Sequence, residues 1–242
     1  KWRDLSLKTK RTRKSFALLD EVMLFFLAAQ SGSRLAALFS ASLPFAFSDP
    51  YDATAGFVPP EMFYGRAAEL DAILGLNGRC FIYGGRQLGK TALMRRAEQA
   101  FHAPDRNRWA QYIDLRASGI GVNRAASEAW QVIAAGMKDL RVLSEAPSAA
   151  DLARKGGIDA LIDHIHAFLD KNDERRILLL LDEADRFFEQ DGRHDYAETR
   201  RLKLLMDTTQ RRFKVIFAGL HNVLRMTERA NHPLAHFGQP IK

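Results

Sequence analysis

Eight residues in the first half of the chain constrain its fold more than any other feature. Gly84-Gly85-Arg86-Gln87-Leu88-Gly89-Lys90-Thr91 fits the pattern GxxxxGK[ST] in full. The apolar run Cys80–Tyr83 precedes it, and a stretch rich in Ala, Leu, Met and Arg follows it. A glycine loop between a buried strand and a helix can curl its backbone, so that successive N–H groups point toward one spot. The sequence therefore predicts a strand, a phosphate-binding loop and a helix in this order.

Each part of this loop has an expected role in holding a nucleoside triphosphate, with ATP the foremost candidate. The expected nucleotide-binding residues are Gly84, Gly85, Arg86, Gln87, Leu88, Gly89, Lys90, Thr91 and Ala92. Lys90 is expected to reach the β- and γ-phosphates, and the Thr91 hydroxyl to ligate Mg²⁺. The start of the following helix adds a partial positive charge. The alternative is a glycine-rich turn that matches the pattern by chance, and the flanking strand and helix make it the weaker one.

A second constellation stands at the end of another apolar run. Ile177–Leu181 is entirely aliphatic and is followed by Asp182-Glu183-Ala184-Asp185. This is typical of a central parallel strand whose carboxyl end opens into an active-site crevice. Asp182 is expected to hold Mg²⁺ from the strand next to that of the loop, and Glu183 to activate an attacking water. The alternative is that Asp182 and Glu183 are solvated acids at a strand end. Asp185 has a weaker claim to be a ligand, because a carboxylate at this position is more often a residue at a helix start.

A third candidate position follows the apolar run Lys214–Ala218. A polar residue at the tip of this strand could contact the γ-phosphate or the attacking water, and His221 and Asn222 are the candidates. Asn222 could equally be the N-cap of the helix that follows.

Apolar runs and helical patterns alternate along the rest of the chain. Strands are expected at Cys80–Tyr83, Trp109–Leu115, Ile177–Leu181 and Lys214–Ala218, and helices at Lys90–Phe101, Asn123–Leu140, Ile158–Lys171, Tyr196–Arg211 and Asn222–Ala230. Apolar strands separated by helices predict an α/β fold whose parallel sheet is covered by helices on both faces. Together with the glycine loop, this predicts a P-loop NTPase.

The N-terminal part has a different character. Residues 1–47 are expected to form a basic helical module in which Ser31-Gly32-Ser33 separates two helices, residues 48–61 an extended linker, and residues 62–242 the core. Of the formal net charge of +7, residues 1–14 supply seven Lys or Arg and one acid. A solvated face is the favoured interpretation of this run, and a nucleic-acid contact the alternative. One cysteine and no apolar stretch long enough to span a bilayer indicate a cytoplasmic protein without membrane contact.

The order of these motifs resembles the AAA+ and STAND groups of P-loop ATPases. Phe63-Tyr64-Gly65-Arg66 with Glu69-Leu70 is similar to an opening element of prokaryotic STAND-type and archaeal-type members, and it precedes the loop and the acidic strand in the same order. The resemblance covers Met62 to about Lys242. It implies that Phe63 to Arg66 line the adenine pocket and that His221 or Asn222 is the first sensor. It also implies a helical lid and a winged-helix module beyond Lys242.

The resemblance implies a molecular switch as the leading functional hypothesis. ATP binding and slow hydrolysis would control homo-oligomerisation and the activation of a protein partner, and the resemblance implies prokaryotic antiviral defence as a setting. An arginine acting on a neighbouring subunit would come from Arg200, Arg201, Arg211, Arg212 or Arg225. The alternative is a nucleic-acid-loading ATPase that grips DNA through residues 1–14. A kinase is a weaker hypothesis, because no separate substrate-binding acids are found.

Overall fold

The computed structural model describes residues 19–42, 63, 65–78, 80–85, 88–219 and 241, and divides the chain into two units, Lys1–Gly65 and Arg66–Lys242. In the first unit, helix α2 (Glu21–Ala28) and helix α3 (Arg34–Ser42) contact each other. Asp20 caps α2 by accepting a hydrogen bond from the Met23 N–H at 2.8 Å. The expected pair of helices with a break at Ser31-Gly32-Ser33 is confirmed, whereas the expected linker lies outside the described residues.

The second unit is built on a sheet of four parallel strands. These are β1 (Phe81–Tyr83), β2 (Arg108–Asp114), β3 (Arg176–Asp182) and β4 (Phe213–Gly219), in the spatial order β1-β4-β3-β2. Ile241 forms a further parallel bridge with Ile82 of β1. The predicted α/β class with a parallel sheet is therefore confirmed. The expectation that Asp182 lies on the strand next to β1 is wrong, because β4 pairs with both β1 and β3 and separates them.

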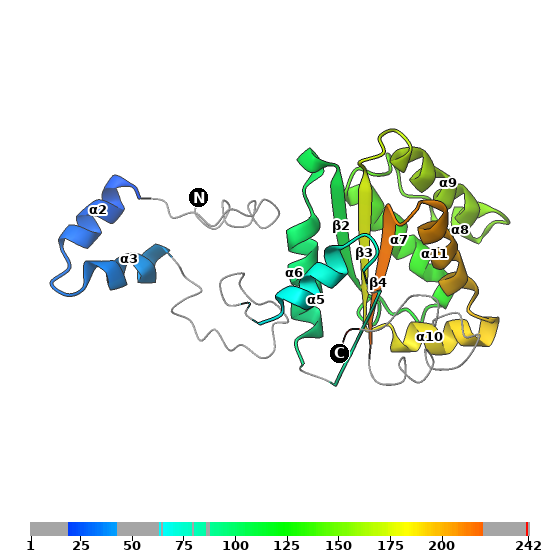
Figure 1. The fold of residues 1–242 in the computed structure, drawn as a ribbon, viewed down its shortest axis with the longest axis horizontal. Helices are drawn as coiled ribbons and strands as arrows, with labels where there is room; N and C mark the ends of the chain where they lie inside the picture. The colour runs from blue at the N-terminus through cyan, green and yellow to red at the C-terminus, as the bar shows by residue number, and fades with distance from the viewer. Residues whose placement is uncertain are drawn as a thin grey trace. The chain divides into compact units, whose positions relative to one another are not determined.

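Helices cover the sheet on both sides (Figure 1). Helix α5 (Ala67–Leu74) and helix α6 (Lys90–Phe101) lie on one side, and α7 (Ala129–Asp139), α9 (Gly157–Leu169) and α11 (Ala197–Thr208) on the other. Side chains alternate accordingly along β2. The Tyr112 ring faces Arg95 of α6, whereas Trp109 meets the edge of Phe168 of α9 at 4.9 Å between ring centroids. The core thus consists of two layers with the sheet between them.

The expected helices differ from the observed ones mainly where the chain makes short elements. The bounds of α6 agree with the prediction, but the helix expected from Asn123 begins only at Ala129, after the 3₁₀ turn η4 (Ala126–Glu128). The sequence patterns missed α5, α8 (Ala149–Ala153) and the 3₁₀ turns η3 (Pro104–Arg106) and η5 (Gly192–His194). For α10 (Asp185–Asp191) they gave no bounds, but the interpretation of Asp185 as a residue at a helix start is confirmed. The helix expected at Asn222–Ala230 lies outside the described residues.

A cluster of phenylalanines anchors the segment that follows the acidic strand. Phe187 and Phe188 of α10 are fully buried and contact Phe217 of β4, with ring centroids 6.2 and 4.9 Å from it. Phe188 also contacts Phe81 of β1 at 5.9 Å. Because α10 begins only three residues after Asp182, this packing fixes the turn that carries the acidic residues.

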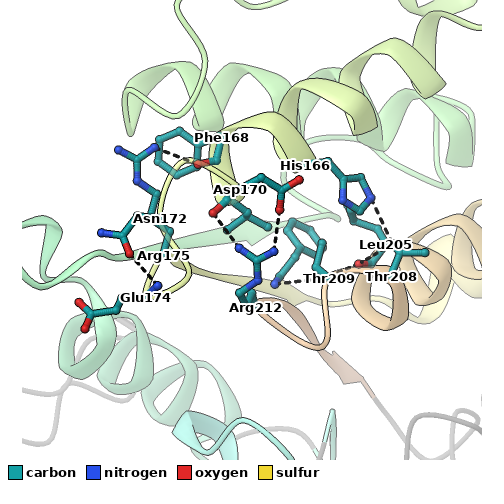
Figure 2. A network of polar contacts seen from close by, with 12 residues as sticks. His166, Phe168, Asp170, Asn172, Glu174, Arg175, Leu205, Thr208, Thr209 and Arg212 are labelled. Carbon is teal, nitrogen blue, oxygen red and sulfur yellow. Dashed lines mark hydrogen bonds and ion pairs between the residues drawn. The ribbon is translucent and has the colours of Figure 1, made fainter.

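A polar network ties the segments that enter β3 and β4 to each other (Figure 2). The Arg212 guanidinium donates to the Leu169 carbonyl and to Asp170, both at 2.7 Å, and His166 of α9 lies 3.1 Å from the Thr208 hydroxyl of α11. Arg175 donates to the Phe168 carbonyl at 2.9 Å. These contacts lie at the amino ends of the strands. They therefore stabilise the end of the sheet where the strands begin, whereas Asp182 lies at the end where β3 finishes.

Lys214 joins β4 to the end of α5. Its ammonium donates to the main-chain carbonyls of Ile73 at 2.7 Å, Gly75 at 2.6 Å and Ala72 at 3.4 Å, and so satisfies carbonyls that a helix end leaves free. The side chain is only 4% exposed, and burial lowers the pKa of Lys214 to about 8. Burial therefore makes the charged form of Lys214 less favourable in the folded protein than in water.

We expect a pH dependence of stability from this buried amine. An unfolded lysine has a pKa of about 10.4, so between this value and about 8 the unfolded chain binds more protons than the folded one. The free energy of unfolding should rise with pH across this window, by about 1–3 kcal/mol relative to Lys214→Met, as measured by urea denaturation of both proteins. Parallel pH profiles of the two proteins would show that Lys214 does not titrate in this way.

Candidate functional site

The ammonium of Lys90 lies under the glycine loop. It donates to the carbonyls of Gly84 at 3.0 Å and of Gly85 at 2.8 Å, and the side chain is 9% exposed. The first two residues of the loop thus lie close to the start of α6. Arg86 and Gln87 lie outside the described residues, and Leu88 is exposed.

The start of α6 offers main-chain donors. Gly89 is the N-cap residue with φ +72°, a left-handed conformation that favours glycine, and no side chain caps the helix. The first helical hydrogen bond runs from the Leu93 N–H to the Gly89 carbonyl at 2.9 Å. The N–H groups of Lys90, Thr91 and Ala92 precede that bond, so the helix supplies no carbonyl for them. This end of the helix carries a partial positive charge that suits an anion.

The structure brings the loop and the acidic strand together. The Thr91 hydroxyl donates to Oδ2 of Asp182 at 2.7 Å, although the two residues are 91 positions apart. Asp182 is 1% exposed. It accepts two further hydrogen bonds, from the Tyr112 hydroxyl to Oδ2 at 2.8 Å and from the Glu183 N–H to Oδ1 at 2.9 Å. Three donors thus hold this one carboxylate in place.

Glu183 stands where β3 ends and has an unusual backbone conformation. Its φ is +53°, in the left-handed region that a non-glycine residue adopts at a cost. The next residue, Ala184, donates its N–H to the Ala218 carbonyl of β4 at 2.9 Å and so holds the turn in place. Burial, followed by the charges of Asp182 and Asp185, raises the pKa of Glu183, while Lys90 opposes this rise. The carboxyl is thus a stronger base than an ordinary glutamate.

Arg66 lies beside the glycine loop. It precedes α5, and its Nε is 3.7 Å from the Glu69 carboxylate. Its Nη1 would lie 3.9 Å from a Cβ placed on Gly89. This Nη1 atom is buried and, among the described residues, has no hydrogen-bond partner. A buried guanidinium donor without an acceptor is costly, so its position next to the loop favours an anionic or polar ligand there.

The candidate sensor residues His221 and Asn222 lie outside the described residues. The strand that leads to them is described, and it lies between the loop and the acidic strand. Gly219, the last residue of β4, is the register partner of Tyr83, which directly precedes the loop. The chain therefore leaves β4 between Gly84 and Asp182.

Four of the five candidate arginines for a contact with another subunit make contacts within this chain. Arg200 pairs with Asp195 at 2.7 Å and Arg201 with Glu198 at 3.0 Å. Arg211 donates to the Gly78 carbonyl at 3.3 Å, and Arg212 belongs to the network in Figure 2. Arg225 lies outside the described residues.

Within residues 19–42, 63, 65–78, 80–85, 88–219 and 241, no group of three or more His, Cys, Asp or Glu side chains could hold a metal ion. Mg²⁺ needs no such group, since it is usually bound through one or two carboxylates together with substrate phosphates. In the same part of the chain, no helix is long and apolar enough to cross a bilayer.

Comparison of the chain with protein-family models, curated proteins and solved structures finds no match. The geometry of the site is therefore the basis for any functional conclusion. Sequence patterns located Lys90, Thr91, Asp182 and Glu183, but they missed Tyr112. Its signal, an aromatic residue within an apolar strand, is common to many buried strands.

Proposed function

We propose that this chain is an ATPase of the P-loop class, with the AAA+ and STAND groups as its nearest likeness. The observation that carries the proposal is the 2.7 Å hydrogen bond between Thr91, next to the loop lysine, and Asp182 at the end of β3. This contact joins a phosphate-binding loop to a buried carboxylate. In P-loop NTPases these two groups hold the phosphates and Mg²⁺.

The residues present fit a triphosphate and a magnesium ion. The glycine loop, the main-chain N–H groups at the start of α6 and the Lys90 ammonium would surround the phosphates. The Thr91 hydroxyl donates a hydrogen bond to Asp182, so the lone pairs of the Thr91 oxygen remain for a metal. Bound Mg²⁺ would neutralise charge on the β- and γ-phosphates. The orphaned donor of Arg66 supports a contact of this residue with the same nucleotide.

Glu183 supplies the base for hydrolysis in this proposal. Its raised pKa and its position next to Asp182 suit a group that takes a proton from an attacking water. The sequence patterns single out no separate set of acids for a hydroxyl substrate, so water is the favoured acceptor. The reaction is then hydrolysis of the terminal phosphoanhydride of ATP.

We further propose that the nucleotide state controls self-association. ATP should raise the mass measured by multi-angle light scattering above that of the ADP-bound or nucleotide-free protein, because a bound ligand shifts the equilibrium toward the state that it prefers. A Lys90→Ala protein should show no such rise. ATP binding by calorimetry without any change in mass would contradict the switch while leaving the ATPase proposal intact, and the absence of ATP binding would contradict both.

A further inference from the structure

Tyr112 reaches the Asp182 carboxylate from a strand that sequence analysis did not connect with the site. It lies on β2, which pairs with β3 so that Asp114 is the register partner of Asp182 and Tyr112 that of Leu180. Tyr112 and Asp182 are thus diagonal neighbours on the face that α6 covers, within reach of a long side chain. The phenol hydroxyl donates to Oδ2 of Asp182 at 2.8 Å.

The tyrosine ring is held in place by α6. The Arg95 guanidinium lies 3.6 Å from the centre of the Tyr112 ring, and Glu98 accepts the Tyr112 N–H at 2.9 Å. Arg95 and Glu98 form an ion pair at 3.2 Å. Thr91, one turn earlier on the same helix, donates to the same carboxylate oxygen of Asp182. One helix therefore positions both hydroxyl groups that reach Asp182.

This arrangement defines the orientation of the carboxylate. The terminal torsion of an aspartate is broad, so its oxygens take a fixed direction only when donors hold them. Tyr112 and Thr91 hold Oδ2, and the Glu183 N–H holds Oδ1. Hydrogen bonds to ligating carboxylates contribute to metal affinity.

We propose that Tyr112 is a positioning residue whose hydroxyl fixes the Asp182 carboxylate for Mg²⁺. This inference rests on the proposed ATPase function, because it assigns Asp182 to the metal. It goes beyond that function because it predicts that contacts from β2 and α6 contribute to the affinity for Mg²⁺. Tyr112 itself touches neither the nucleotide nor the metal in this proposal.

The test is Tyr112→Phe, which keeps the ring under Arg95 and removes only the hydroxyl. ATP binding is measured by calorimetry over a range of Mg²⁺ concentrations and separately in EDTA. The Mg²⁺ concentration for half-maximal enhancement of ATP binding should rise on the order of 10-fold, the lower end of the effect of losing such a hydrogen bond. The affinity for ATP in EDTA and the circular dichroism spectrum should stay unchanged. Tyr196→Phe, a hydroxyl removed at the start of α11, should match the wild type throughout.

Two results would overturn the inference. The first is a Mg²⁺ requirement of Tyr112→Phe equal to that of the wild type. The second is an ATP affinity that falls equally with and without Mg²⁺, because such a fall would indicate a purely structural role of the hydroxyl. If this variant does not fold, Arg95→Met provides the test, because it loosens the ring and should raise the Mg²⁺ requirement to a smaller extent. An unchanged requirement in Arg95→Met would then overturn the inference. Failure of the wild-type protein to bind ATP would instead contradict the proposed function.

Discussion

Replacement of Lys90 by alanine is expected to lower the affinity for ATP by roughly 100-fold or more. The ammonium is buried under the loop at 2.8 and 3.0 Å from two loop carbonyls, and no other lysine of the described residues shares this position. Loss of one partner from a buried, hydrogen-bonded charge pair costs about 2–5 kcal/mol, and each 1.4 kcal/mol is tenfold in affinity. Isothermal titration calorimetry with Mg²⁺ and ATP measures the change directly.

The fold should survive this substitution. Lys90→Ala leaves the Gly84 and Gly85 carbonyls without their donor, which costs about 1–3 kcal/mol where water cannot replace it. The spectrum of circular dichroism should be unchanged, with a moderate fall in melting temperature. Lys138→Ala is the matched control, because it removes the same charge from the exposed last turn of α7. A Lys90→Ala protein that binds ATP as tightly as this control would contradict the assignment of the loop.

The elements that the sequence predicted are those with a strong local pattern. The four strands were placed to within one residue at each end, because each is an apolar run between polar residues. Helix α6 follows a glycine with positive φ and has twelve residues, enough to show a helical period. Helices α8 and α10 have only five and seven residues, too few to show a helical period, so α8 was missed and only the start of α10 at Asp185 was anticipated.

The site was predictable only in its local parts. Lys90 and Thr91 follow from the spacing of the glycine loop, and Asp182 from its place after five aliphatic residues. The position of β4 between β1 and β3 depends on pairing across long stretches of chain, which no local pattern encodes. The same holds for Tyr112, whose contact with Asp182 spans 70 positions and requires the register of β2 on β3.

Glu183→Gln is expected to lower the rate of ATP hydrolysis by about 10²–10⁴-fold while leaving ATP affinity within about threefold of the wild type. The amide keeps the size of the side chain but cannot accept a proton from water. The residue adopts φ +53° and lies at the strand end without ligating the proposed metal, so the substitution leaves Thr91 and Asp182 in place. Phosphate release and calorimetry, performed on the same preparation, separate the two effects.

The pH dependence of hydrolysis provides an independent check on the same carboxylate. A general base must be ionised, so the rate should fall as the pH drops through the pKa of Glu183, which burial and the neighbouring Asp182 raise above the ordinary glutamate value. The acid limb of the rate profile should therefore lie at higher pH than for an exposed glutamate, and it should vanish in Glu183→Gln. Glu189→Gln, an exposed carboxylate of α10 paired with Arg186, should retain both the rate and this limb. Hydrolysis by Glu183→Gln at the rate of the Glu189→Gln control would show that another group activates the water, because the two variants differ only in which carboxylate is lost.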